Sequence, residues 1–237
     1  MPLPRIKICC IRDAAEAALA ISRGVDALGL VSAMPSGPGV IDDTTIAAIA
    51  ATVPPPIATF LLTSLTDAGA IIEQQRLCRC NTLQLVDAVP PGTHARLRAA
   101  LPGIALVQVI HVVDSASVDE AVALAPEVDA LLLDSGNPAL AVKELGGTGR
   151  VHDWALSRAI VERSGKPVFL AGGLRPDNVA EAIRTVRPFG LDLCNGVRRD
   201  GRLDADRLAA FDPWAARSGV AGLAEPAVKF RVSLSGR

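Results

Sequence analysis

The chain has 237 residues, half of them apolar and only 3% aromatic, with a formal net charge of −1. This nearly neutral charge gives no reason to expect nucleic-acid or acidic-membrane binding, and no apolar run approaches the roughly 20 residues that a membrane span needs. Because the N-terminus also lacks a secretory signal and five scattered cysteines form no disulfide pattern, we expect a cytoplasmic globular protein with an aliphatic core.

Short apolar runs alternate with Ala-rich segments along the whole chain. Strands buried in a parallel sheet are continuous apolar runs, and Asp, Ser or Thr before a segment with Gly or Pro after it delimits a helix. These signals predict eight strands, at residues 5–10, 27–31, 57–62, 82–86, 104–110, 130–133, 168–171 and 191–194. They predict helices at residues 13–23, from 42 or 43 to about 51, from 66 or 67 to 76, 92–101, from 115 or 117 to 124, 153–163, from about 176 to 183, and from 203 to about 214.

The strict alternation of strand and helix predicts a parallel sheet with right-handed crossovers. Eight units in a chain of this length favour an α/β fold of the (β/α)8 or TIM-barrel type, and an open doubly wound sheet is the alternative. We assign residues 1–217 to a single barrel domain. Residues 218–237 have no partner in this scheme and form a predicted short C-terminal extension.

Candidate functional residues follow the strands. In such barrels the working side chains lie at the C-terminal ends of the strands and in the loops after them. Alternation places Lys7 and Cys9 on one side of the first strand, so Cys9 points into the barrel mouth if Ile8 packs outward. The seventh strand ends in Gly172-Gly173 before a helix, an arrangement that presents backbone N–H groups to a phosphate. The other candidates on this face are Gln84, Asp134, the loop 146–149 with Gly147, Asp192, Asn195 and Gly196.

Each of these residues also has an ordinary structural interpretation. A Cys at the end of a buried strand can be an inert small hydrophobe, and Asp134 can form an Asx-turn. Paired glycines also make plain tight turns. His152 precedes a helix cap, whereas His94 and His111 belong to no motif. A functional site is favoured because a thiol, a carboxylate and two Gly turns all fall on one predicted face.

Six segments, in this order, resemble one enzyme family. They are Lys7-Ile-Cys9, Gly24-Val-Asp-Ala-Leu-Gly-Leu30, Leu131-Leu-Leu-Asp-Ser135, Gly146-Gly-Thr-Gly-Arg-Val-His-Asp-Trp154, residues 170–183 and residues 186–192. The family is that of the phosphoribosylanthranilate isomerases, (β/α)8 enzymes of tryptophan biosynthesis. The resemblance extends from about Lys7 to Phe211, nearly the whole predicted barrel.

The resemblance implies an Amadori rearrangement of a phosphorylated aminoaldose to an aminoketose, with neither metal nor organic cofactor. It implies that Asp134 is the general acid at the ribose ring oxygen and that Cys9 is the general base at C2′. Burial would keep Asp134 protonated, and the cation of Lys7 would favour the Cys9 thiolate.

The same resemblance implies a small-molecule partner, a phosphosugar, and a protein that is a monomer or homodimer. The phosphate would rest on N–H groups of Gly172-Gly173 and Asn195-Gly196. The remaining predicted substrate-binding residues are Lys7, Gln84, Gly147 and Asp192.

The chain departs from the family pattern at four places. Cys10 replaces the Gly that usually follows the catalytic Cys, and Gly39 stands where an Arg usually meets the anthranilate carboxylate. Val86 replaces a His, and the usual Ser-Ser-Gly-Val-Glu becomes Cys194-Asn-Gly-Val-Arg198. Because the lost Arg removes a strong bidentate contact, two alternatives stay open. One is a paralogous isomerase or lyase for another phosphorylated sugar, and the other is a non-catalytic phosphosugar-binding barrel.

Overall fold

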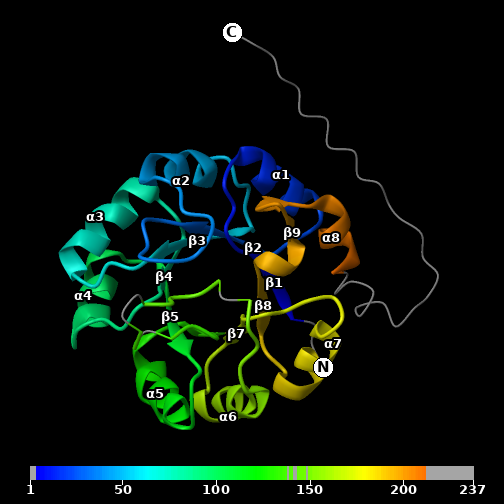
Figure 1. Cartoon of the computed structure of the whole chain (residues 1–237). Coiled ribbons are helices and arrows are strands. Elements are labelled where there is room, and N and C mark those ends of the chain that lie inside the picture. The colour runs from blue at the N-terminus through cyan, green and yellow to red at the C-terminus, as the bar shows by residue number, and fades with distance from the viewer. Residues whose placement is uncertain (1–3, 138, 141–142, 148, 212–237) are drawn as a thin grey trace.

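The protein is a closed barrel of eight parallel strands, seen here in a computed structural model that describes residues 4–137, 139–140, 143–147 and 149–211. Figure 1 shows the helices as a ring around it. The strands are β1 (Arg5–Ile8), β2 (Ala27–Val31), β3 (Ala58–Thr63), β4 (Thr82–Leu85), β5 (Ala105–His111), β6 (Ala130–Asp134), β7 (Val168–Leu170) and β8 (Gly190–Leu193). The helices are α1 (Ala14–Ser22), α2 (Asp43–Ala50), α3 (Ala68–Cys78), α4 (Thr93–Ala100), α5 (Ala116–Leu124), α6 (Trp154–Ser164), α7 (Val179–Val186) and α8 (Ala205–Ala210).

The TIM-barrel prediction is confirmed, because the strands pair in chain order and β1 closes the ring by pairing with β8. An open doubly wound sheet is therefore wrong for this chain. The predicted extension, residues 218–237, lies outside the described residues.

Aspartates fix where most helices begin. The side chains of Asp13, Asp42, Asp67, Asp153 and Asp204 each accept a hydrogen bond from a backbone N–H in the first turn of α1, α2, α3, α6 and α8. Each such cap stabilises its helix by roughly 1 kcal/mol.

Two helix starts were predicted too early. Helix α7 begins at Val179, not near Pro176, and the Asn178 side chain makes no cap bond to this helix. Its Nδ2 atom donates instead to the Gly173 carbonyl at 3.0 Å and thereby ties down the turn after β7.

Helix α8 begins at Ala205, not at Leu203. Leu203 belongs to a short hairpin that the sequence did not reveal, formed by β9 (Arg198–Arg199) and β10 (Arg202–Leu203). A 3₁₀ turn, η2 (Asn195–Val197), precedes this hairpin, and another, η1 (Ala125–Glu127), follows α5. The predicted helix end at Trp214 lies outside the described residues.

The strands divide the core into two layers. Ile8 belongs to the outer layer, between strands and helices, whereas Cys9, Phe60 and Phe169 belong to the layer inside the barrel. The rings of Phe60 and Phe169 meet edge to face, with centroids 5.7 Å apart. The predicted outward direction of Ile8 and inward direction of Cys9 are therefore what the structure shows.

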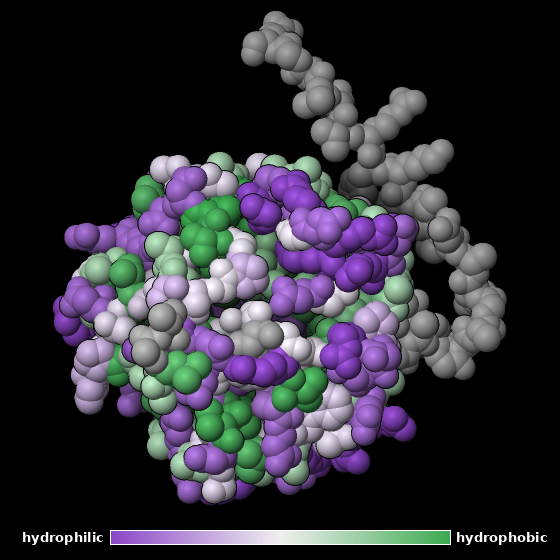
Figure 2. Space-filling model, viewed as in Figure 1, coloured by the Kyte–Doolittle hydropathy of each residue, from purple (hydrophilic) through white to green (hydrophobic). Residues whose placement is uncertain are grey.

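The surface is polar over one part of this view. Figure 2 shows strongly hydrophilic residues gathered over α1, α8 and β9. In the part of the chain that the structure describes, none of the helices has the length and apolar character needed to cross a membrane.

Candidate active site

A buried ion pair forms the floor of the site. Strand register places Lys7 beside Asp192, and Lys7 Nζ lies 2.8 Å from Asp192 Oδ2 with the Lys7 side chain fully buried. The same ammonium lies 5.1 Å from the centroid of the Phe60 ring. Burial is the largest influence on the pKa of Lys7 and lowers it, but attraction to Asp192 and Cys9 outweighs burial, so the pKa is raised. Lys7 is therefore a buried cation at the floor of the site.

Gly29 on β2 makes room for the functional end of β1. A methyl group added at Gly29 would lie 3.1 Å from Cys9 Sγ and 3.2 Å from Lys7 Nζ. The Cys9 thiol and the Lys7 ammonium therefore both lie against Gly29, where the neighbouring strand has no side chain. Lys7 is the nearby cation that the sequence predicted for Cys9.

Asp134 ends β6, with β7 and β8 between it and Cys9 on the barrel wall. It is only 7% exposed, and its Oδ1 atom accepts the backbone N–H of Ser135 at 2.8 Å. Its Oδ2 atom faces Gly146, where an added methyl group would come within 2.6 Å. The loop after β6 therefore folds back over the carboxyl group at a residue that has no side chain.

His152 packs close to Asp134 and Gly172. Burial is the main cause that lowers the pKa of His152, and the charge of Asp134 partly opposes it. Its Nε2 atom lies 2.6 Å from Ser157 Oγ, whereas its buried Nδ1 atom has no partner among the described residues. A methyl group at Gly172 would lie 3.2 Å from that Nδ1. His152 is thus a neutral neighbour of the candidate acid.

The loops after β6, β7 and β8 meet at glycines. Asn195 Nδ2 donates to the Gly147 carbonyl at 3.1 Å. A methyl group at Gly173 would lie 2.8 Å from the Arg150 carbonyl oxygen, and one at Gly196 would lie 2.4 Å from the Leu174 carbonyl oxygen. Such close backbone approach produces a concave surface lined by main chain.

Two polar atoms of the pocket wall lack partners. Gln84 Oε1 and Asp192 Oδ1 are buried, and neither accepts a hydrogen bond from the described part of the chain. Buried polar atoms are normally hydrogen-bonded, so these two oxygens are suited to accept hydroxyl groups of a ligand. Both residues were candidates from the sequence alone.

One pocket brings nearly all the predicted residues together. Lys7 is not on the wall of this pocket, but it is paired with Asp192, which is. The pocket also has an apolar side, formed in part by Met34, Pro38 and Leu145, that the sequence did not single out because such residues carry no motif. The predicted residues on the wall are Cys9, Gln84, Asp134, Gly147, Gly172, Gly173, Asp192, Asn195 and Gly196.

The comparisons with known proteins agree on one family. Residues 6–212 match the family model of N-(5′-phosphoribosyl)anthranilate (PRA) isomerase. The chain belongs to the PRA isomerase family. The PRA isomerase of Methanocella arvoryzae is 32% identical over 87% of this chain and 94% of its own length.

Solved PRA isomerases share the fold of this family member. The Thermus thermophilus enzyme has a TM-score of 0.75 and 26% identity, covering 90% of this chain and 99% of that one. A PRA isomerase in complex with reduced 1-(o-carboxyphenylamino)-1-deoxyribulose 5-phosphate has a TM-score of 0.71 and 25% identity, covering 88% of this chain and 96% of that one.

Two departures from the PRA isomerase pattern are coupled in space. A methyl group at Gly39 would lie 2.4 Å from Cys10 Cβ, and the φ angle of Gly39 is +79°. The family Arg at position 39 therefore cannot be accommodated while position 10 carries a side chain. At the third departure, the Val86 side chain lines the pocket and is 1% exposed.

We expect Gly146→Ala to lower kcat roughly 10- to 100-fold, because the new methyl group would displace the Asp134 carboxyl group. The φ angle of Gly146 is +138°, so backbone strain adds to the collision. Steady-state kinetics would measure the effect. Gly165→Ala is a control for a methyl group at a positive φ angle, since Gly165 has a φ angle of +64° and open space around it. An equal loss in both variants would contradict the view that contact with Asp134 is the cause.

Proposed function

We propose that this chain catalyses the Amadori rearrangement of N-(5′-phosphoribosyl)anthranilate to 1-(o-carboxyphenylamino)-1-deoxyribulose 5-phosphate, a step of tryptophan biosynthesis. The observation that carries the proposal is that a thiol and a carboxyl group face one pocket whose far side is built from glycine backbone. Family membership over nearly the whole barrel supports it.

The first step opens the ribose ring. Asp134 acts as general acid and gives its proton to the ring oxygen as the bond from that oxygen to C1′ breaks. The nitrogen lone pair then forms the C=N bond of a Schiff base. Asp134 is buried, with 7% exposure, and lines the pocket, so its carboxyl group is placed to reach the ring oxygen of a bound substrate.

The second step moves a proton from C2′. The Cys9 thiolate takes that proton, the C–H electrons form a C1′–C2′ double bond, and the enolamine tautomerises to the ketone. Lys7 Nζ and Cys9 Sγ both lie against Gly29, so the Lys7 ammonium is the nearby positive charge that would stabilise a thiolate. Its pairing with Asp192 holds the ammonium in place.

The phosphate end of the substrate would lie against Gly172-Gly173 and Asn195-Gly196, where the three loops meet. Backbone N–H groups and the absence of side chains make such a surface complementary to phosphate oxygens. The orphaned Gln84 Oε1 and Asp192 Oδ1 would accept sugar hydroxyls.

The aryl end needs a partner for the carboxylate. No Arg or Lys occurs among the described residues that line the pocket. At this rim, Lys143 Nζ lies 2.5 Å from Asp87 Oδ2, and the Lys143 carbonyl accepts a hydrogen bond from Ser36 Oγ at 2.6 Å. Ser36 and Val86, the neighbour of Asp87, line the pocket. We assign the carboxylate contact to Lys143, which replaces the lost Arg from a different loop.

Lys143→Ala is expected to raise KM for phosphoribosylanthranilate about tenfold with little change in kcat, because a charge-assisted contact far from the reacting carbons is lost. Lys166→Ala is the control, because Lys166 Nζ is bonded to the Val128 carbonyl, before β6 and away from the strand ends that carry the pocket. An unchanged KM in the Lys143 variant would contradict the assignment.

The decisive test mixes the purified protein with phosphoribosylanthranilate and follows the loss of the substrate's fluorescence. Rapid loss supports the proposal. A folded protein that binds phosphate but leaves the fluorescence unchanged would favour the second candidate, an isomerase for another N-linked phosphosugar. The uncharged lining of the aryl end is the observation that favours this candidate.

A further inference from the structure

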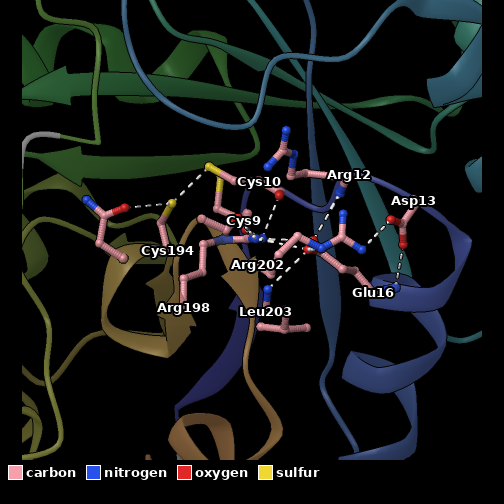
Figure 3. A network of polar contacts seen from close by, with 11 residues as sticks. Cys9, Cys10, Arg12, Asp13, Glu16, Cys194, Arg198, Arg202 and Leu203 are labelled. Atoms are coloured by element: carbon pink, nitrogen blue, oxygen red, sulfur yellow. Dashed lines mark hydrogen bonds and ion pairs between the residues drawn. The ribbon is translucent and has the colours of Figure 1, made fainter.

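Two departures from the family pattern place one thiol beside another at the edge of the pocket. Cys10 follows β1 and Cys194 follows β8, and their Sγ atoms lie 2.9 Å apart (Figure 3). A disulfide bond is about 2.05 Å long, so the two sulfurs need to approach by less than about 1 Å. Both thiols are free and both line the pocket.

The backbone at Cys10 is unusual for a residue with a side chain. Its φ angle of +63° lies in the left-handed region that favours glycine, and glycine is what the family usually has here. Gly39 leaves the space that the Cys10 side chain fills. An unfavourable backbone held in place by its surroundings is typical of functional positions.

The surroundings shift the pKa values of the two thiols in opposite directions. The hydrogen bond with Cys10 is the main cause that lowers the pKa of Cys194, the Arg198 guanidinium adds to it, and burial opposes both. Hydrogen bonds with Cys194 and Cys9, followed by burial, raise the pKa of Cys10. Cys194 is also the more exposed of the pair. Cys194 is therefore suited to attack as a thiolate, and Cys10 to supply a proton.

We propose that Cys10 and Cys194 form a redox-responsive dithiol at the edge of the pocket, which peroxide oxidises to an intramolecular disulfide. The Cys194 thiolate attacks one peroxide oxygen, the O–O bond breaks, and the released hydroxide becomes water by taking up the proton that the Cys194 thiol lost to solvent on ionising. The resulting sulfenic acid is attacked by the Cys10 sulfur, the S–O bond breaks, and the oxygen leaves as a second water with the Cys10 proton. Two thiols lose two electrons, and one peroxide gains them.

Disulfide formation would connect the pocket's first and last strands. Cys194 Sγ lies 3.7 Å from Asn195 Oδ1, and the Asn195 side chain is bonded to the loop after β6. Oxidation therefore joins the segment just after β1, which carries Cys9, to the loop that carries Asn195 and Gly196. The thiol pair lies beside the catalytic groups without being one of them.

The test treats the full chain with hydrogen peroxide, counts free thiols and measures intact mass. We expect the count to fall from five to three, a mass loss of two hydrogen atoms, and full reversal by dithiothreitol. Because Cys9 and Cys10 lie in one tryptic peptide, variants are needed to show which of the two is linked to Cys194. The link between this peptide and the one with Cys194 should persist in Cys9→Ala and disappear in both Cys10→Ala and Cys194→Ser.

Cys80→Ala is the matched control, because burial raises the pKa of the Cys80 thiol to about 12 and leaves it unreactive. This variant should lose two thiols as the parent protein does. Three results would overturn the proposal. They are a link that survives in Cys10→Ala, a link between two copies of the chain, and conversion of Cys194 to a sulfinic acid without any link.

Discussion

Turnover is expected to fall by at least about 10²-fold in Cys9→Ala and in Asp134→Asn, since general acid–base groups each contribute about 10²–10⁴-fold. Alanine removes the sulfur that would take the C2′ proton. Asparagine retains the shape of Asp134 and can still accept the Ser135 N–H bond, but it has no acidic proton to give to the ring oxygen.

Both variants should fold and bind, which separates chemistry from structure. Circular dichroism and the midpoint of thermal unfolding would report the fold, and titration with the reduced product analogue would report binding. Cys80→Ala, a change of a buried thiol outside the pocket, should keep its activity. Full turnover in either active-site variant would contradict the assigned roles. Lost binding in both would instead point to a damaged pocket.

Single-turnover measurements would distinguish the two roles further. Without Asp134 the ring should stay closed, so no Schiff base accumulates. Without Cys9 the ring can open but removal of the C2′ proton becomes the slow step, so substrate deuterated at C2′ should react more slowly than ordinary substrate. In Asp134→Asn ring opening limits the rate, so deuterium at C2′ should have no effect. The two variants should therefore differ in their isotope effects even when their kcat values are similar.

The barrel could be predicted because its signals are local. Continuous apolar runs and capping aspartates are visible within a few residues, and they placed all eight strands to within a few positions. The pocket face followed from a general rule, that functional groups of such barrels lie at the C-terminal ends of strands. That rule does not depend on which helices cover which strands.

What the sequence did not reveal depends on contacts between distant segments. The replacements at Cys10 and Gly39 looked like independent losses until the structure showed that one side chain fills the space of the other. The link of Lys143 to Asp87 likewise joins two loops that no periodicity relates. Such pairs depend on the parallel sheet, which brings the loops after different strands to one edge.

Helix α7 shows a local signal that tertiary contacts overrode. Asn178 has the residue type of an N-cap, yet its amide nitrogen holds the Gly173 carbonyl and its Oδ1 atom accepts the Arg175 N–H at 2.8 Å. The turn after β7 uses this side chain, and the helix starts without it.

Arg198 holds the backbone just after β1, in a network that Figure 3 shows. Its NH1 group donates to Glu16 Oε2 and to the Gly201 carbonyl, at 3.1 and 3.2 Å. Its NH2 group donates to the carbonyls of Cys9, at 3.0 Å, and Cys10. The side chains of Arg198 and Glu16 are 5% and 4% exposed. One buried guanidinium thus neutralises a buried carboxylate and fixes the backbone that carries the proposed base.

Arg198→Met is expected to lower the free energy of unfolding by up to about 3–5 kcal/mol, because the buried Glu16 charge then retains only its contact with the half-exposed Arg202, 3.4 Å away. For a chain of this size this corresponds to a fall in Tm of about 6–20 °C. Urea unfolding would measure the loss. The matched control is the next residue: Arg199→Met breaks an ion pair with Asp204 in which the arginine side chain is 56% exposed, so it should cost no more than about 1 kcal/mol.

The double variant Glu16→Gln/Arg198→Met separates charge from hydrogen bonding. If the Glu16 carboxylate, left with only Arg202 as an ion-pair partner, is the main cost, the double variant should be more stable than Arg198→Met alone, because no carboxylate charge remains buried. If the lost donors to Cys9 and Cys10 dominate, the double variant should be no more stable than Arg198→Met. Both variants should then also have a lower kcat than the parent protein, since the Cys9 backbone is released in both. Stability close to that of the parent protein in Arg198→Met would refute the view that this network holds the end of β1.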